Sequence, residues 1–207
     1  MKKILAFDFD GTLVDSKDAL ADAFNESFRK NNLLGVDKEK IKKQIGIPAE
    51  KLVSGFYPNL TGRKLRRVIE NKQSLLDISK YKLKPNVNRT LLKLKSKYDL
   101  AIVSNATHRQ VVENMKIVGI DPKLFKAIVA VDDVVYPKPN PEPLQKLSDA
   151  LEQEIIAYVG DIEVDIETAK AYGTKSIILL GSRNHQELIG ENPDIIIKDL
   201  AELSELL

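Results

Sequence analysis

Two aspartates end an apolar run near the N-terminus, in the stretch ILAFDFDGTLVDS of residues 4–16. Asp8 and Asp10 are separated by one residue, so the alternation of a β-strand places both carboxylates on the same side. Two neighbouring carboxylates repel each other unless a cation lies between them. Gly11 follows directly and permits a tight turn or the close approach of a ligand. The pattern therefore indicates a cation site, with two solvated acids in a turn as the alternative.

A second pair of acids stands in the stretch GDIEVDIETA, residues 160–169. Asp161 follows an apolar, β-rich run, and Asp165 comes four residues later, so both face the same way if a helix has begun. Glu163 lies between them and is expected to point elsewhere. Acids at a helix N-terminus also interact favourably with the helix dipole. That alternative accounts for one acid, but not for acids at the ends of two separate strands.

A hydroxyl and a lysine stand at two further positions that suit an anion. Ser104 and Asn105, in AIVSNA, come after an apolar run and before a predicted helix, whose N-terminus favours anions. An ordinary helix N-cap is the alternative. Lys138 lies in YPKPNPEP, residues 136–143, where the prolines restrict the backbone and leave the side chain little entropy to lose. The alternative for this segment is a stiff surface loop.

The elements that position these residues follow from the apolar pattern. Six β-rich runs are predicted as buried strands, at residues 4–7, 100–104, 127–131, 155–159, 176–180 and 195–197. Amphipathic segments predict helices at residues 107–118, 141–152, 163–172 and 199–207. The alternation of strands and helices predicts an α/β fold, with a parallel sheet covered by helices on both faces. Functional groups of such sheets gather at the carboxyl ends of the strands.

The strand ends together indicate one site. Four carboxylates brought close to one another are unfavourable without a counter-ion. A site built from oxygen ligands selects a hard cation, and few protein ligands suit Mg²⁺, which keeps positions open for water and phosphate. Lys138 adds a second positive charge and Ser104 adds a hydroxyl donor. We therefore expect a pocket for a phosphoryl group.

One region interrupts the alternation of strands and helices. Residues 17–80 contain no convincing strand and several helical segments, which predicts an all-helical insert between the first strand and the rest of the sheet. Pro85 marks the return to the sheet. The basic stretch GRKLRRV, residues 62–68, is predicted to be a solvated helix face, with attraction of an anionic substrate as the alternative.

Composition excludes several classes of protein. The 207 residues suit one domain, or a core domain with an insert, and 32 basic against 30 acidic residues give a net charge of +2. This balance does not support a nucleic-acid or membrane-surface partner. The apolar run after MKK is broken by Asp8, so it is too short for a signal peptide. With no cysteine there is no disulfide and no thiolate metal site, and we expect a cytoplasmic protein.

The motifs resemble those of a known family. DFDGTLVDS, VSN, KPNPEP and GDIEVDIETA resemble, in this order, the four sequence motifs of the haloacid dehalogenase-like (HAD) hydrolase superfamily, and most closely its phosphoglycolate phosphatase-like branch. The resemblance spans residues 8–169. It implies a Rossmann-like core at residues 1–15 and 82–207 and a helical cap inserted after the first strand at residues 16–81.

The resemblance also implies roles for the acids. Asp8 is the expected nucleophile, which forms an aspartyl-phosphate. Asp10 is the expected general acid, which protonates the leaving oxygen and then acts as the base that activates water. Asp8, the backbone carbonyl of Asp10 and Asp161 are the expected Mg²⁺ ligands, and Asp165 supports the metal through water or Lys138. Mg²⁺ lowers the pKa of Asp8, whereas a neighbouring acid raises that of Asp10.

A phosphate site accompanies these acids. By the same resemblance, Ser104 and Lys138 hold the phosphate oxygens and offset charge in the transition state, so both count as catalytic. Asn105, Gly11 and Thr12 complete the expected phosphate site, and Thr12 is expected to position the attacking water or Asp10.

The insert departs from the usual pattern of the family. The re-entry segment reads Pro85-Asn86 where the family usually has Pro-Gly, and the insert is short for the branch. The stretch IGIPAEKL, residues 45–52, resembles the cap loop that reaches into the pocket. Gly46, Ile47 and Pro48 are therefore candidates for substrate contact, with a plain helix start as the alternative.

The two histidines of the chain lie outside the predicted site. His108 is expected to be an exposed residue at a helix start, with a position at the rim of the pocket as the alternative. His185 is expected to lie in a polar loop.

These expectations combine into a functional prediction. The chain is expected to be a phosphatase that acts on small phosphorylated metabolites, with phosphoglycolate as one candidate. Asp10 argues against a haloacid dehalogenase, which lacks an acid at that position. The alternatives are a phosphomutase or other phosphotransferase of the same superfamily, and a phosphoacceptor signalling module. Receiver domains of the latter kind carry the acceptor on a middle strand and have no helical insert. The substrate and the oligomeric state are left open.

Overall fold

The fold is organised around a parallel β-sheet. The computed structural model describes residues 2–181 and 183–207. Within these residues the main sheet has six strands in the order β5-β4-β1-β6-β7-β8, and all neighbours are parallel. The strands are β1 (Ile4–Phe7), β4 (Asp99–Val103), β5 (Phe125–Val129), β6 (Ile155–Gly160), β7 (Lys175–Leu179) and β8 (Ile195–Ile197). The predicted α/β class is confirmed.

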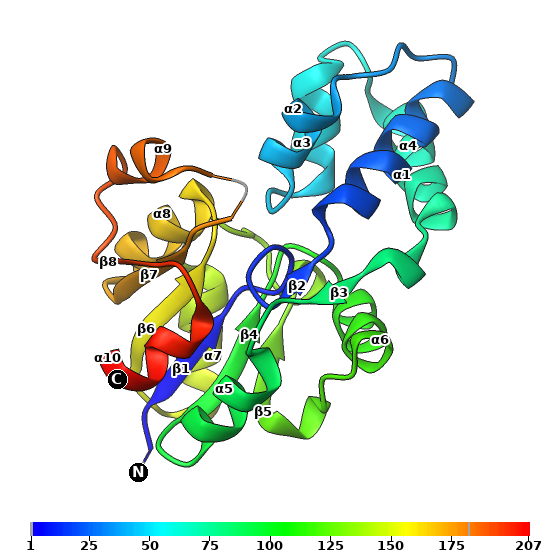
Figure 1. Ribbon diagram of the computed structural model, residues 1–207. Coiled ribbons are helices and arrows are strands. Elements are labelled where there is room, and N and C mark those ends of the chain that lie inside the picture. Colours follow the sequence, from blue (N-terminus) through cyan, green and yellow to red (C-terminus); the bar gives the residue numbers. More distant parts are fainter. Residues whose placement is uncertain (1, 182) are drawn as a thin grey trace.

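Helices cover both faces of this sheet (Figure 1). Alternate residues of β1 point to opposite faces, as the strand geometry requires. Leu5 and Phe7 share one apolar cluster with α5 and α6, whereas Ile4 and Ala6 share another with α7 and α8. These helices are α5 (Val87–Lys95), α6 (His108–Val118), α7 (Glu142–Leu151) and α8 (Glu163–Tyr172).

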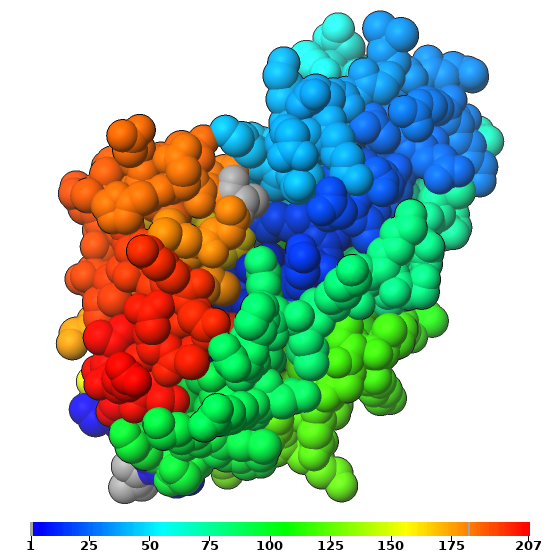
Figure 2. Space-filling view, in the orientation of Figure 1, coloured from blue at the N-terminus to red at the C-terminus, as the bar shows by residue number. Residues whose placement is uncertain are grey.

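Four further α-helices lie between the first strand and the rest of the sheet. They are α1 (Lys17–Lys30), α2 (Lys38–Gln44), α3 (Ala49–Phe56) and α4 (Gly62–Leu75). In the space-filling view this helical segment forms a lobe beside the sheet (Figure 2). The chain leaves and returns along one antiparallel pair, β2 (Val14–Asp15) and β3 (Lys82–Leu83). The exact core and cap boundaries stay a prediction.

The apolar interior of the helical segment is continuous with the cluster on one face of the sheet, and the outer face of the segment is charged. Phe24 and Phe28 are buried, and the Phe28 ring packs edge-on against Tyr57 with 5.0 Å between the centroids. Val68 of α4 is also buried. The basic side chains of the 62–68 stretch are exposed, as predicted for a solvated face.

Several boundaries differ from the prediction. β5 ends at Val129, two residues early, because the Ala130 N–H donates to Asp133 Oδ2 (2.8 Å) instead of continuing the ladder. Helix α5 is an element that the sequence analysis does not predict. The predicted helix at 199–207 is divided into a 3₁₀ turn and a short helix. These and the remaining short helices are η1 (Ile78–Lys80), η2 (Pro122–Leu124), η3 (Val131–Asp133), η4 (Leu200–Glu202), α9 (His185–Ile189) and α10 (Leu203–Leu206).

The prediction for His108 is confirmed, whereas the prediction for His185 is wrong. His108 is exposed and begins α6, as predicted. The prediction of a loop at His185 is wrong, because His185 begins α9. The side chain of Asn184 caps this helix by accepting from the Glu187 N–H at 2.9 Å.

The unusual Pro85-Asn86 pair has a conformational explanation. Asn86 has φ +61°, in the left-handed region where asparagine is tolerated far better than most residues with a Cβ. Its Nδ2 also donates to both carboxylate oxygens of Asp199, at 3.1 and 2.9 Å. Asparagine thus supplies the backbone freedom of the usual glycine and adds a tether to the start of η4.

Candidate active site

The site lies at the carboxyl ends of three neighbouring strands. Asp8 follows β1, Ser104 follows β4 and Asp161 follows β6, and β1 lies between the other two strands. The chain passes from β1 to β4 on one side and later reaches β6 on the other. Such a reversal opens a crevice at the carboxyl edge of a parallel sheet. The fold therefore gathers residues from separate motifs in one place.

Lys138 is the positive centre of this cluster. Its Nζ donates to Asp8 Oδ1 at 2.8 Å, Asp165 Oδ1 at 2.8 Å and the Tyr158 hydroxyl at 2.7 Å. The side chain is 1% exposed, so these bonds replace water almost completely. The proline-rich loop thus holds its lysine inside the molecule.

Three aspartates form a group that could hold a cation. Asp8, Asp161 and Asp165 each offer one carboxylate oxygen, and these atoms lie within 4.8 Å of one another. Asp165 is also engaged elsewhere, since its Oδ2 accepts from the backbone N–H groups of Asp161 and Ile162 at 3.0 and 3.2 Å. Within the described residues, Asp8 Oδ2 is buried and has no hydrogen-bond partner. Buried, unsatisfied carboxylate oxygen fits a hard divalent cation.

The pKa of Asp8 is raised mainly by burial and further by neighbouring negative charge. Burial, first, and then the charges of Asp165 and Asp161 raise it from the ordinary 3.8 to about 8, although Lys138 opposes the shift. Burial also raises the pKa of Asp161, while the ammonium of Lys17 opposes that change. A cation bound here would favour the ionised acids.

Asp161 is surrounded by groups from the first motif. Lys17 Nζ lies 2.5 Å from its Oδ2, and Thr12 Oγ1 donates to its Oδ1 at 3.2 Å. Gly11 has φ +95°, and a Cβ there would lie 2.4 Å from Lys17 Cε and 2.6 Å from Asp161 Oδ1. Only glycine fits so close an approach. In this structure Thr12 and Gly11 therefore pack around the acid group.

Asp10 has an environment of its own. Its Oδ1 accepts from the Ser16 hydroxyl at 2.5 Å, and its side chain is not one of the three that form the acid group. Burial raises the pKa of Asp10, while the hydrogen bond from Ser16 and the positive charges of Lys72 and Lys17 oppose the shift. Two acids on one strand end thus have different partners, which suits different roles.

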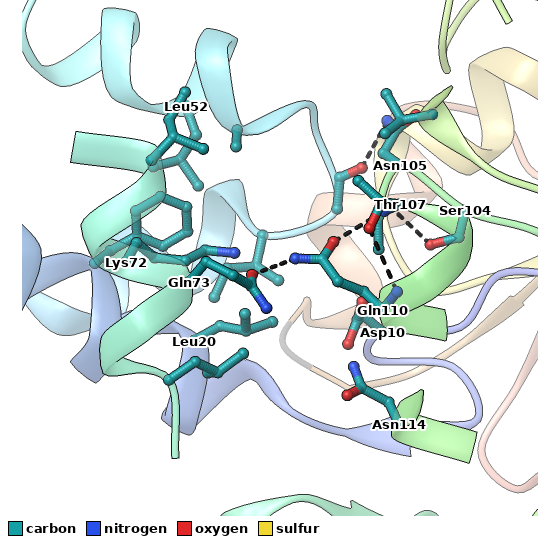
Figure 3. Close-up of a pocket in the computed structure, with 18 of the residues that line it drawn as sticks. Asp10, Leu20, Leu52, Lys72, Gln73, Ser104, Asn105, Thr107, Gln110 and Asn114 are labelled. Carbon is teal, nitrogen blue, oxygen red and sulfur yellow. Dashed lines mark hydrogen bonds between the residues drawn. The ribbon is translucent and has the colours of Figure 1, made fainter. Parts of the chain in front are cut away.

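A cavity of about 500 Å³ connects the acids with the helical segment (Figure 3). Asp8, Asp10 and Ser104 line it on the sheet side, and Ser104 Oγ accepts from the Ala106 N–H at 3.1 Å. Apolar side chains of the helical segment line the opposite side: Leu20, Phe24, Ile45, Leu52, Ile69 and Leu76. The cavity thus has a polar end at the sheet and a largely apolar wall.

Asn105 ties the two sides of the cavity together. Its Nδ2 donates to the carbonyls of Gly46 (2.9 Å) and Lys138 (3.2 Å), and its Oδ1 accepts from the Lys138 N–H at 3.1 Å. The amide of Asn105 is therefore engaged by the backbone. Of the loop residues proposed for substrate contact, Gly46 and Ile47 line the cavity, whereas Pro48, the residue directly before α3, does not.

Sequence reasoning missed several side chains of this site, among them Tyr158 and Lys17. The Tyr158 hydroxyl lies 2.9 Å from the Val103 carbonyl and 3.2 Å from Asp165 Oδ1. It also accepts from Lys138 Nζ at 2.7 Å, so it helps to orient Lys138. A tyrosine within an otherwise apolar buried strand was the available signal, because a buried phenol needs a partner. Lys17 follows the first motif directly, but nothing in its spacing singles it out.

The sequence of this chain is similar to those of known hydrolases. The family described as haloacid dehalogenase-like hydrolase matches residues 5–179. The chain is 33% identical to a phosphoglycolate phosphatase of Haemophilus influenzae (strain 86-028NP), with 99% of this chain and 98% of that protein covered. It is 29% identical to the pyrophosphatase PpaX of Bacillus pumilus (strain SAFR-032), with 95% and 92% covered.

A solved structure extends the similarity to the whole fold. The crystal structure of a predicted phosphoglycolate phosphatase from Haemophilus somnus 129pt superposes with a TM-score of 0.87 at 26% identity, covering 99% of this chain and 97% of that one. The chain therefore belongs to the haloacid dehalogenase-like hydrolase family, in its phosphoglycolate phosphatase-like branch, and is an enzyme of the phosphatase type.

Proposed function

We propose that this enzyme is a Mg²⁺-dependent phosphatase that hydrolyses small organic phosphomonoesters through an aspartyl-phosphate on Asp8. The observation that carries the proposal is the state of Asp8. It is buried at the end of β1, one oxygen accepts from Lys138, and the other has no partner among the described residues. It also lines a cavity large enough for a small metabolite. A carboxylate held in this way is positioned to act as a nucleophile.

The first step transfers the phosphoryl group to the enzyme. A carboxylate oxygen of Asp8 forms a bond to phosphorus while the bond from phosphorus to the leaving oxygen breaks. Asp10 donates its proton to that oxygen, which its raised pKa favours. Lys138 and the Ser104 hydroxyl stabilise charge on the phosphoryl oxygens.

The second step restores the enzyme. Asp10, now ionised, takes a proton from water as the water oxygen bonds to phosphorus. The bond from phosphorus to Asp8 breaks, and inorganic phosphate leaves. One residue thus acts as acid and then as base, which returns both aspartates to their starting protonation states.

Asp8, Asp161 and the backbone carbonyl of Asp10 would hold the metal, and Asp165 would support it through Lys138. When bound, Mg²⁺ would supply positive charge that favours ionised Asp8 and neutralises phosphate oxygens. The hard oxygen donors and the unpartnered Asp8 Oδ2 support this assignment.

Residues 16–81 would act as the cap that closes the cavity, and phosphoglycolate is the first substrate to test. The names of the similar proteins support that choice. The cytoplasmic location and the absence of nucleic-acid and membrane partners stay predictions.

The test is phosphate release from p-nitrophenyl phosphate and a panel that includes phosphoglycolate, pyrophosphate and sugar phosphates. We expect Mg²⁺-dependent release that stops with EDTA and is lost in Asp8→Asn. Asp15→Asn, which changes an exposed acid of β2, is the matched control and should keep activity.

Asp10→Asn should slow turnover strongly while leaving metal binding nearly intact. Normal turnover by Asp8→Asn would contradict the proposal, and isomerised sugar phosphates without phosphate release would indicate a mutase.

A further inference from the structure

One buried lysine of the cavity lacks a carboxylate partner. In the part of the chain that the structure describes, the buried basic side chains are Lys17, Lys72, Lys138 and Arg183. Arg183 pairs with Glu163, and Lys17 and Lys138 pair with aspartates of the site. For Lys72, 8% exposed on α4, the described residues provide neither an ion pair nor a hydrogen bond. The Nζ atom of Lys72 itself stays accessible from the cavity that the side chain lines. An ammonium held at a largely apolar cavity wall without an anion is unfavourable, so it calls for an explanation.

The surroundings of Lys72 place its charge at the cavity. Its Nζ lies 5.1 Å from the centroid of the Phe24 ring, a cation–π contact that compensates only part of the lost hydration. Burial lowers the pKa of Lys72, and the charge of Asp10 opposes that shift, yet no ion pair joins the two side chains. Figure 3 shows Lys72 extending from α4 toward the side where Asp10 and Gln110 lie.

A polar link holds α4 against the sheet side of the cavity. The Gln110 amide donates to Gln73 Oε1, and Gln110 Oε1 in turn accepts from the Thr107 N–H at 2.9 Å. Gln73 is the neighbour of Lys72, and Thr107 caps the helix that follows Ser104. The link therefore sets the position of α4, the helix that carries Lys72, relative to the sheet side of the cavity.

We propose that Lys72 binds a carboxylate on the leaving group of the substrate, so that the enzyme prefers phosphomonoesters of hydroxy acids. The proposal rests on the proposed function, because it takes the phosphoryl group to lie at Asp8. Arg109 also lines the cavity, but its side chain is 85% exposed and pairs with Glu113. The ammonium of Lys72 therefore offers one buried-wall charge, which matches the single charge of a carboxylate. A second phosphate, with a charge of about −1.5 to −2, would leave negative charge uncompensated there.

The test compares two substrates of the same shape. Phosphoglycolate carries the carboxylate, and the phosphate ester of glycolamide replaces it with an uncharged amide. A charge-assisted hydrogen bond to a buried ammonium corresponds to about a tenfold to hundredfold preference, measured as the ratio of the two kcat/KM values. We expect this ratio in the wild-type enzyme and its collapse toward one in Lys72→Met.

Two further variants distinguish a role of Lys72 in binding the carboxylate from a role in maintaining the fold. Lys64→Met removes an exposed lysine from the same helix, and it should leave the ratio unchanged. Lys72→Arg keeps the charge and should retain part of the preference. If Lys72 had a purely structural role, its replacement would lower kcat/KM for both substrates by the same factor and would leave the ratio of the two values unchanged.

The outcomes distinguish this proposal from the function on which it rests. No release of phosphate from any ester, p-nitrophenyl phosphate included, would overturn the proposed function. Active wild-type enzyme with a ratio near one would overturn the role of Lys72 alone, even if Lys72→Met did not fold. A preserved ratio in folded Lys72→Met would do the same.

Discussion

The ammonium of Lys138 lies 2.8 Å from the carboxylate of Asp8, although 130 positions separate the two residues in the chain. The same ammonium lies 2.8 Å from Asp165, which in turn accepts from the backbone at the start of α8. One lysine therefore connects the end of β1 with the helix that follows β6. The charge balance of the site and the positions of Asp8 and Asp165 therefore depend on the same lysine.

Lys138→Met should destabilise the protein and abolish turnover. The change leaves Asp8 and Asp165 buried without their cation, and breaking a buried ion pair costs about 3–5 kcal/mol. We expect a loss of that order in the free energy of unfolding, measured with urea in EDTA. Lys175→Met, at an exposed position of β7, is the control and should change it by less than about 0.5 kcal/mol. Equal stability of the two variants would contradict the central role of Lys138.

Asp8 should make the metal-free protein less stable as the pH rises. Its pKa in the folded protein is about 8 against the ordinary 3.8, so between these values the folded state binds more protons than the unfolded state. The free energy of unfolding therefore falls with pH across this window. The difference between wild type and Asp8→Asn, from urea midpoints in EDTA at pH 5 to 8, isolates the effect. The prediction would be refuted if the free energy of unfolding of the wild type rose with pH relative to that of Asp8→Asn.

Mg²⁺ should stabilise the protein more at pH 8 than at pH 5. Protons compete with the metal for buried carboxylates, and binding to the folded state alone raises the melting temperature. Thermal unfolding with Mg²⁺ and with EDTA measures the shift at each pH. We expect the shift to be reduced in Asp161→Asn and kept in Asp15→Asn. A shift that survives Asp161→Asn in full would remove Asp161 from the metal site.

Tyr158→Phe should impair the position of Lys138 without removing any charge. The change deletes the phenol that lies 2.7 Å from Lys138 Nζ and 2.9 Å from the Val103 carbonyl. Loss of a buried hydrogen-bond partner costs about 1–3 kcal/mol. We expect a lower free energy of unfolding and a several-fold lower kcat with a smaller change in KM. Unchanged kcat in a destabilised variant would limit Tyr158 to a structural role.

Gly160→Ala should disturb the site through sterics alone. A Cβ at Gly160 would lie 2.2 Å from Asp165 Cβ, so Asp165 and with it Lys138 must move. We expect a loss of about 1–3 kcal/mol or more in unfolding free energy and a marked loss of kcat. Gly55→Ala is the matched control, because nothing lies near its Cβ position and alanine favours helix α3. Similar behaviour of the two variants would argue against the close approach.

Much of the fold could be predicted from the order of apolar runs. β1 and β8 have the predicted bounds, and the other four strands differ by one or two residues at one or both ends. The predicted site acids also follow strands, because chain order and side-chain period place them there. Asp8, Asp161 and Asp165 do lie together. Helix α9 was missed because a short polar helix depends on its cap, here Asn184, more than on periodicity.

The class of fold, the motif residues at the strand ends and the family could be predicted from the sequence, because these depend on local pattern and on motif order. Which groups are neighbours became known only from the folded structure. Lys17 reaches Asp161 across 144 positions, and Tyr158 reaches Lys138 across 20. Lys72 faces the cavity without a carboxylate partner among the described residues, because packing of α4 against α1 buries it there. Burial and the identity of neighbours set charge and pKa, and neither is a property of spacing along the chain.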